Sequence, residues 1–258
     1  MEDIEEEKKE QENTEEVKPK NKKTIKKVLI IIGILIVLAI IGIIVYANVF
    51  GNCEDDGNNW RWYVPSALSG PNGAIYIDKP IIYLYPEKTT EVTVKLGNPE
   101  KITCSYPKYT TGWNVIASPD GTLVDTNTGR KLYSLYWEGL GDNKNDLEEG
   151  FVVKGDETIE FLEEKLEILG LNEFEAEEFI VYWLPKLESN KYNYIRFATM
   201  EEINKNMPLE FSVEPDTIIR VLMQYKGLDE PIEVKEQELV TPERNGFVAV
   251  EWGGSELK

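Results

Sequence analysis

The sequence predicts an α+β fold in which an antiparallel, β-rich domain with a helical hairpin follows one transmembrane helix. Three observations predict it. The first is the apolar run Val28–Ala47, which contains no charged residue. The second is a two-residue alternation of apolar side chains between residues 75 and 138, and the third is a helical periodicity that begins at Ile159. The chain is therefore expected to contain a tail, a span, a linker and a folded C-terminal part.

The run Val28–Ala47 is expected to cross a membrane as a helix. Its twenty residues, at about 1.5 Å of rise per residue, give a length of about 30 Å, which matches the hydrocarbon core of a bilayer. A cleaved secretory signal is the alternative, but its apolar core would be shorter, and Ala47-Asn48-Val49 does not resemble a cleavage site. The run therefore predicts an uncleaved signal anchor in a single-pass membrane protein.

Residues 1–27 are polar, show no apolar periodicity and predict a disordered tail. Acidic residues come first in this tail, and six lysines then precede the span: Lys18, Lys20, Lys22, Lys23, Lys26 and Lys27. Basic residues beside a span remain on the cytoplasmic side of the membrane. The tail is therefore expected in the cytoplasm, and the C-terminal part is expected to be an extracellular domain.

The whole chain carries a net charge of −19, and residues 1–27 account for little of it because nine acidic residues there accompany eight lysines. The acidic excess therefore belongs to the part beyond the span. Such a surface repels phosphates, so nucleic acids and anionic lipids are not expected as partners. The chain has no His, which removes the usual general base and zinc ligand, and two cysteines are too few for a structural zinc site. No metal or other cofactor is expected.

Residues 48–74 are rich in Asn, Gly and Pro and predict a linker. Residues 75–138 predict an antiparallel β subdomain, because apolar residues alternate with polar ones and turn signals recur about every ten residues. The run Ile81–Tyr85 is apolar on both faces and predicts a central strand. The alternating sets that follow are Val92, Val94 and Leu96, then Ile102, Cys104 and Tyr106, then Trp113, Val115 and Ala117.

Residues 139–258 predict an α+β subdomain that begins with a loop over 139–155. A stripe of apolar residues then predicts a helix that ends at Gly170, and Asn172 with Glu175 predicts the capped start of a second helix. The two helices are expected to form a hairpin that covers a sheet. Further strands are expected over residues 194–197, 209–213, 217–225 and 247–252, with a helical turn over 200–205.

Charged residues within these strands need partners. Arg196 and Arg220 lie in otherwise apolar strands, where an unpaired guanidinium is costly to bury. Each is therefore expected to have a carboxylate partner.

Two interpretations of the cysteines stay open. Cys53 and Cys104 are both expected outside the cell, where disulfide bridges persist, and a bridge between them would connect the linker to the sheet. Alternatively, Cys104 shares a strand face with Ile102 and Tyr106 and is a buried thiol.

Two strand ends each place a glutamate beside a tryptophan, with Glu138 after Trp137 and Glu251 before Trp252. Glycosidases use two carboxylates about 5–10 Å apart. One hypothesis therefore assigns Glu251 as the acid and Glu138 as the nucleophile or base. In this hypothesis Trp137 and Trp252 are stacking platforms for sugar rings.

The alternative is structural: both tryptophans belong to the core, and the two glutamates neutralise Arg196 and Arg220. Two classes of function follow from these interpretations. The first is a membrane-tethered extracellular binding or structural domain, with a cell-envelope polysaccharide or a protein as its ligand. The second is a carboxylate-based hydrolase of cell-envelope polysaccharide.

The C-terminal domain resembles a group of uncharacterised bacterial membrane-anchored proteins in four segments: KPIIYLYPEK (79–88), LYWEG (135–139), FIVYWLPKLESNKYN (179–193) and ERNGFVAVEWGG (243–254). No activity, ligand or catalytic residue is attached to that group, so the resemblance implies no function. It supports a domain boundary near residue 75.

Overall fold

The computed structural model describes residues 74–142 and 147–257, together with Ile31. The predicted tail, span and linker therefore lie outside the described residues, apart from Ile31 and Ala74. Among the described residues, no helix is both long and apolar enough to cross a membrane. The chain divides into two compact units, Met1–Val64 and Pro65–Lys258, and the second unit contains the folded domain.

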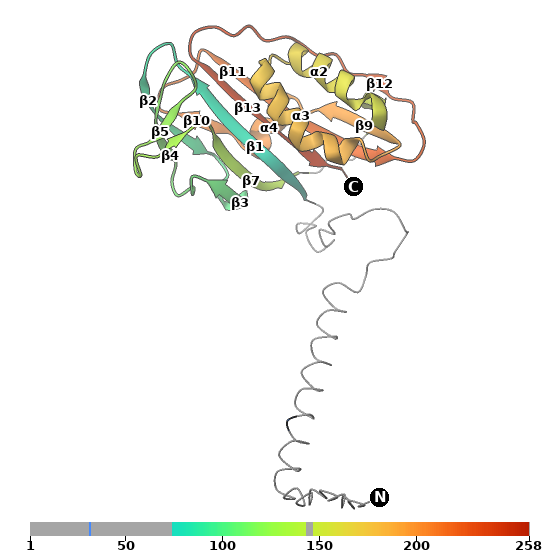
Figure 1. Cartoon of the computed structure of the whole chain (residues 1–258), viewed down its shortest axis with the longest axis horizontal. Helices are drawn as coiled ribbons and strands as arrows, with labels where there is room; N and C mark the ends of the chain where they lie inside the picture. The colour runs from blue at the N-terminus through green and yellow to red at the C-terminus, as the bar shows by residue number, and fades with distance from the viewer. Residues whose placement is uncertain (1–30, 32–73, 143–146, 258) are drawn as a thin grey trace, which may run out of the picture. The chain divides into compact units, whose positions relative to one another are not determined.

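This domain has an α+β, strand-rich architecture with few helices (Figure 1). Its helices are α2 (Thr158–Ile168), α3 (Glu173–Leu187) and α4 (Met200–Asn206), with short 3-10 turns at Pro99–Lys101 and Gly155–Glu157. Its strands are β1 (Ile75–Tyr85), β2 (Thr90–Leu96), β3 (Ile102–Tyr106), β4 (Trp113–Ala117), β5 (Leu123–Asp125), β6 (Lys131–Leu132), β7 (Leu135–Gly141), β8 (Glu149–Lys154), β9 (Tyr192–Phe197), β10 (Leu209–Phe211), β11 (Thr217–Leu228), β12 (Lys235–Glu236) and β13 (Val248–Glu256).

The larger sheet has eight strands in the order β12-β8-β9-β11-β13-β1-β7-β3. Neighbouring strands are antiparallel except for the pairs β11–β13 and β12–β8, which are parallel. The prediction that Ile81–Tyr85 forms a central strand is confirmed, because β1 lies between β13 and β7 and its residues 81–84 are buried. The two subdomains expected over residues 75–138 and 139–258 share this sheet and belong to one compact unit.

The predicted helical hairpin covers one face of the larger sheet (Figure 1). Leu162 of α2 and Trp183 of α3 are fully buried against apolar residues of β9, β11 and β13. The first helix ends because Gly170 adopts a φ of 86°, which an L side chain rarely adopts. The second begins with the expected capping box, in which Asn172 and Glu175 each bond the other's backbone N–H at 2.9 Å.

A smaller sheet lies over the opposite face, with the strand order β10-β2-β4-β5-β6. The predicted alternation is confirmed in β2 and β4, where every second residue is buried. These residues pack against the side chains of β1 and β7 that point away from the helices, such as Leu84 and Trp137. The larger sheet therefore has a core on each face.

The prediction that residues 139–155 form a loop is wrong for those of them that the structure describes. β7 extends to Gly141, and the short apolar run at residues 151–153 lies in β8. Phe151 and Val153 are buried in this strand because β8 pairs with β9 beneath α2. A run of only three apolar residues carries too little periodicity to distinguish a strand from a loop.

Candidate functional site

The two predicted catalytic glutamates lie on opposite faces of the larger sheet. Ile82 is the register partner of both Glu251 in β13 and Leu135 in β7, so these three side chains share one face. Glu138 comes three residues after Leu135 and therefore points to the other face, the face that carries the helices. The pairing of Glu138 with Glu251 is wrong, because no single substrate bond reaches carboxylates on both sides of a sheet.

Glu251 instead belongs to a buried ion pair. Its Oε2 accepts a hydrogen bond of 2.6 Å from Nε of Arg220, and its Oε1 accepts one of 2.9 Å from the indole of Trp137. Arg220 also donates to Oδ1 of Asn204 and to the backbone oxygen of Met207. These partners satisfy both charged groups, so the structural interpretation of Glu251 is supported.

The predicted tryptophan platforms are not exposed. Trp137 is 2% exposed and Trp252 is fully buried, because each is on a central strand of the larger sheet and points into one of its two cores. A sugar ring cannot stack on a side chain that protein already covers. Their assignment to ligand binding is therefore wrong.

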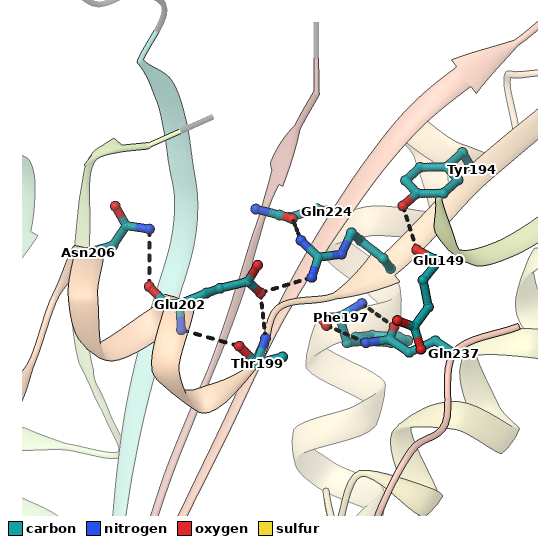
Figure 2. A network of polar contacts seen from close by, with 9 residues as sticks. Glu149, Tyr194, Phe197, Thr199, Glu202, Asn206, Gln224 and Gln237 are labelled. Carbon is teal, nitrogen blue, oxygen red and sulfur yellow. Dashed lines mark hydrogen bonds and ion pairs between the residues drawn. The ribbon is translucent and has the colours of Figure 1, made fainter. Parts of the chain in front are cut away.

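Arg196 also has the carboxylate partner that was expected, but the partner is Glu202 rather than Glu138. Arg196 donates to Glu202 at 2.9 Å and to Gln224 at 2.7 Å. Figure 2 shows that the same Glu202 carboxylate accepts the backbone N–H of Thr199 and so completes the capping box of α4. Helix α4 thus supplies the charge that neutralises a strand arginine.

A side-chain amide continues the larger sheet beside this network. Gln237 accepts a hydrogen bond from the backbone N–H of Phe197 and donates one to its backbone oxygen, at 2.9 and 2.7 Å (Figure 2). This pair of bonds substitutes for a neighbouring strand, because the amide has the same donor and acceptor groups as a peptide unit. The network in Figure 2 is therefore structural.

Cys104 is exposed and free within the described part of the chain, and its predicted partner Cys53 lies outside that part. The expectation of a buried thiol is wrong, because β3 is the edge strand and no helix covers this end of the sheet. The disulfide bridge stays a prediction.

The helix-side face of the sheet is covered unevenly, and this creates the candidate site. Figure 1 shows α2 and α3 in front of the strands around β9, β11 and β13, with β1 beside α3 and with β7 and β3 uncovered by helices. We call this uncovered part, together with the adjoining edge of α3, the open face. Tyr106, Tyr133 and Phe174 are the exposed aromatic side chains of the described residues, at 48%, 52% and 52%, and all three lie on the open face.

One end of the open face is an aromatic corner, formed by Tyr83, Tyr133, Phe174 and Glu178. The rings of Tyr133 and Phe174 have centroids 6.2 Å apart and meet at 84°, so they present two nearly perpendicular apolar surfaces. The ring of Tyr83 lies behind both, at 6.4 Å from Tyr133 and 6.3 Å from Phe174. The Tyr83 hydroxyl donates a short hydrogen bond to the Glu178 carboxylate, which fixes the orientation of that carboxylate.

The other end is a bulge cluster, formed by Asp78, Lys79, Tyr136, Glu138, Tyr182 and Lys186. The pairing register of β1 shifts between Asp78 and Ile81, because Pro80 has no N–H to donate to the sheet. Lys79 has a φ of 62°, and a positive φ at a residue other than Gly costs on the order of 1–3 kcal/mol. Such strain is concentrated at functional sites.

The lysines of the bulge cluster are held in place by neighbouring groups. Nζ of Lys186 lies 3.4 Å from Oδ2 of Asp78 and donates to the hydroxyl of Tyr182 at 3.2 Å. Nζ of Lys79 lies 5.8 Å from the ring centre of Tyr136 and 5.4 Å from that of Tyr182. Both ammonium groups are therefore already neutralised or stabilised from within the protein.

Burial shifts the titration of several groups on the open face. It raises the pKa of Asp78, which Lys186 opposes and Glu138 reinforces. Burial also raises the pKa of Tyr136, and the adjacent Glu138 carboxylate adds to the rise. The pKa of Tyr83 is raised by burial and then by its bond to Glu178. Tyr83 and Tyr136 thus keep their protons and remain hydrogen-bond donors.

The open face offers three kinds of contact to a ligand: apolar ring surfaces, carboxylate acceptors and tyrosine hydroxyls. Among the described residues, no three Asp, Glu or Cys side chains gather in a way that could hold a metal ion. The carboxylate near Glu138 is Asp78 rather than Glu251. The face therefore has the chemistry of a polar–aromatic binding surface.

The sequence contained two signals for this face that its periodicity did not reveal. The first is Asp78-Lys79-Pro80, in which Pro interrupts an otherwise continuous strand and indicates a bulge. The second is a second stripe on α3, with Phe174, Glu178, Tyr182 and Lys186 spaced four residues apart beside the buried stripe.

The fold and the open face together define a class of protein by architecture: a strand-rich α+β domain with a core on each side of its larger sheet and one half-covered face. No protein-family model, no curated protein and no solved structure matches the chain.

The raised pKa of Asp78 has an expected effect on stability. The folded domain binds this proton more tightly than the unfolded chain, so its stability should fall as the pH rises from the ordinary Asp value of 3.8 through the folded-state pKa. The Asp78→Asn variant lacks this loss. As the pH rises from 3.8 to neutral, the melting temperature of the variant should therefore increase relative to that of the unmodified domain.

The control variant for this experiment should show the opposite dependence of stability on pH. Hydrogen bonds from Thr122 lower the pKa of Asp120, so Asp120 contributes stability that is lost as the pH falls. The Asp120→Asn variant should be relatively less stable at neutral pH and should match the unmodified domain in acid. Parallel melting curves of Asp78→Asn and the unmodified domain at every pH would contradict the assignment.

Proposed function

We propose that the chain is a single-pass membrane protein that presents a binding domain outside the cell, and that the open face is its binding surface. The anchor rests on the apolar run Val28–Ala47, and the orientation rests on the six lysines that precede this run. The observation that carries the binding role is the gathering of Tyr106, Tyr133 and Phe174 on the part of the sheet that the helices leave uncovered.

This cluster of exposed rings is informative because the tryptophans named above are buried. Large aromatic side chains are usually covered, and the same domain buries Trp137, Trp183 and Trp252 completely or almost completely. Exposed aromatic residues that cluster on one face, with polar groups around them, are typical of interaction sites. The hydrolase is not proposed, because its two carboxylates are separated by the sheet.

The orientation is tested with the exposed thiol of Cys104. In the full-length Cys53→Ser variant, a membrane-impermeant maleimide added to intact cells should label Cys104. The control variant places a thiol in the tail, Gln11→Cys with Cys53→Ser and Cys104→Ser, and should react only after the cells are permeabilised. Labelling of Cys104 only after permeabilisation would overturn the proposed orientation.

The binding role is tested with the full-length protein in detergent. Isolated cell envelopes should retain it, and the Tyr133→Ala, Phe174→Ala double variant should bind at least about tenfold more weakly, equivalent to about 1.4 kcal/mol. Val181→Ala, a change at a 68% exposed position of the same helix, should bind normally. Equal retention of the double variant and the unmodified protein would contradict the assignment of the open face.

A further inference from the structure

The open face has a length and a direction as well as a composition. Phe174, Glu178, Tyr182 and Lys186 recur every four residues along one edge of α3, so they follow the helix axis from the aromatic corner to the bulge cluster. Twelve residues of helix cover about 18 Å. This is the length of an extended ligand with several units rather than of a single small molecule.

Aromatic side chains occur at both ends of this length, but only Tyr133 and Phe174, in the aromatic corner, are exposed, and a carboxylate lies between the two ends. The perpendicular rings of Tyr133 and Phe174 form one end, and Tyr182 with Tyr136 forms the other, where Lys79 lies over both rings. Glu178 comes four residues from each of Phe174 and Tyr182. A linear chain along α3 would therefore meet free ring faces, then a hydrogen-bond acceptor, then the polar groups around Tyr182, whose ring Lys79 and Lys186 already cover.

A polysaccharide has the chemistry that fits this arrangement. A pyranose ring has a face of C–H groups, which the negatively charged face of an aromatic ring attracts, and a rim of hydroxyls that donate to carboxylates. A hydrogen bond with Tyr83 already orients Glu178, and contacts with Asp78 and Tyr182 orient Lys186. Such a preorganised surface loses little conformational freedom when it binds a ligand.

The charges on and around the face favour an uncharged chain over a polyanionic one, and Arg130, an exposed cation at its edge, is already bonded to the hydroxyl of Tyr106 at 2.8 Å. The part of the protein beyond the predicted span carries nearly all of the net charge of −19. On the open face itself, the ammonium groups of Lys79 and Lys186 already interact with rings or with Asp78. A sugar chain that carries phosphate or carboxylate groups would meet repulsion without a compensating free cation in this cluster.

We infer that the ligand of the open face is an uncharged, linear polysaccharide that lies along α3 from the aromatic corner to the bulge cluster. This inference rests on the proposed binding role and specifies its ligand. Phe174 and Tyr133 stack on sugar rings at the aromatic corner, Glu178 accepts hydroxyl protons beside them, and the Tyr182 hydroxyl and Lys186 hydrogen-bond sugar hydroxyls at the bulge cluster.

The test uses the full-length protein in detergent and measures its affinity for a panel of purified glycans. The panel contains uncharged linear oligomers of glucose, xylose and N-acetylglucosamine, each from one to eight units, and anionic polygalacturonate and hyaluronan. At least one uncharged series should bind, with an affinity that rises with chain length and levels off once the oligomer covers about 18 Å of helix. The anionic glycans should bind at least about tenfold more weakly.

Two substitutions locate the chain on the face. Phe174→Ala and Tyr182→Ala, at opposite ends, should each weaken binding of the longest oligomer by about tenfold, which corresponds to one lost contact of about 1.4 kcal/mol. Both side chains are at least partly exposed, so the variants should fold, and thermal melting confirms this. Val181→Ala again serves as the matched control, with unchanged affinity.

The outcomes separate this inference from the proposed function. If isolated envelopes retain the protein but no uncharged oligomer binds, or if a monosaccharide binds as well as a long chain, the inference is overturned and the binding role stands. Preferential binding of the anionic glycans, or loss of envelope binding after protease treatment of the envelopes, also overturns it. Failure of envelopes to retain the protein at all contradicts the proposed function itself.

Discussion

Replacing Glu251 with Ala is expected to lower the free energy of unfolding of the domain by about 3–5 kcal/mol. The substitution leaves Arg220 buried without its charged partner, since the Arg220 side chain is 1% exposed. It also removes the acceptor of the Trp137 indole N–H. An uncompensated buried charge costs far more than a lost surface contact, because it has neither water nor a counterion. Chemical denaturation of the compact unit Pro65–Lys258 measures the change.

Two controls show whether the charge is responsible. The Arg220→Met, Glu251→Leu double variant removes both charges and should recover much of the lost stability, because apolar replacements of a buried ion pair are often neutral or stabilising. Lys191→Ala breaks an ion pair with Glu230 whose side chains are 59% and 76% exposed, and should change stability little. If the double variant is no more stable than Glu251→Ala, the loss comes from packing rather than from the unpaired arginine.

Replacing Trp183 with Ala is expected to cost about 3–5 kcal/mol of unfolding free energy. This indole is fully buried in α3 and packs against Phe179, Tyr225 and Gly254, where the helical hairpin meets the centre of the larger sheet. Its removal leaves a cavity that the two rigid layers cannot close, so both transfer energy and packing contacts are lost.

The matched control is again Val181→Ala, two residues away on the same helix. Its side chain is 68% exposed, so its removal creates no cavity and should change stability by less than about 0.5 kcal/mol. Similar losses for Trp183→Ala and Val181→Ala would mean that burial of the indole does not cause the loss, and helix propensity cannot cause it either, because Ala is the better helix former in both cases. Denaturant midpoints of the two variants distinguish these outcomes.

Local patterns predicted the elements because local physics determines them. The alternation in Val92, Val94 and Leu96 identified a strand with one buried face, and the Asn172 capping box identified the start of α3. Sheet partners depend on contacts far apart in the sequence, which no local pattern contains. The order of the strands, and with it the location of Glu138 and Glu251 on opposite faces, was therefore not predictable from periodicity.

The candidate site was missed for a related reason. One of the two hypotheses makes the tryptophans beside the glutamates binding surfaces, and it fails because both side chains are buried in a core, as the alternative expects. The exposed rings come instead from the edge strand, from the β6–β7 connection and from the first turn of α3, where Tyr106, Tyr133 and Phe174 lie. Residues from such separate places form one surface only after folding. The need of Arg196 and Arg220 for partners was predictable, because burial of a charge has the same cost in any fold.

The position of β13 between β1 and β11 has a consequence for when the domain can fold. All other described strands precede β13 in the chain, yet β1 and β11 do not pair with each other and are joined only through it. The centre of the larger sheet therefore cannot form until the ribosome has synthesised β13, and pairing over so long a sequence separation is intrinsically slow. A domain of this topology therefore lacks its central strand pairing until nearly all of its described residues have been synthesised.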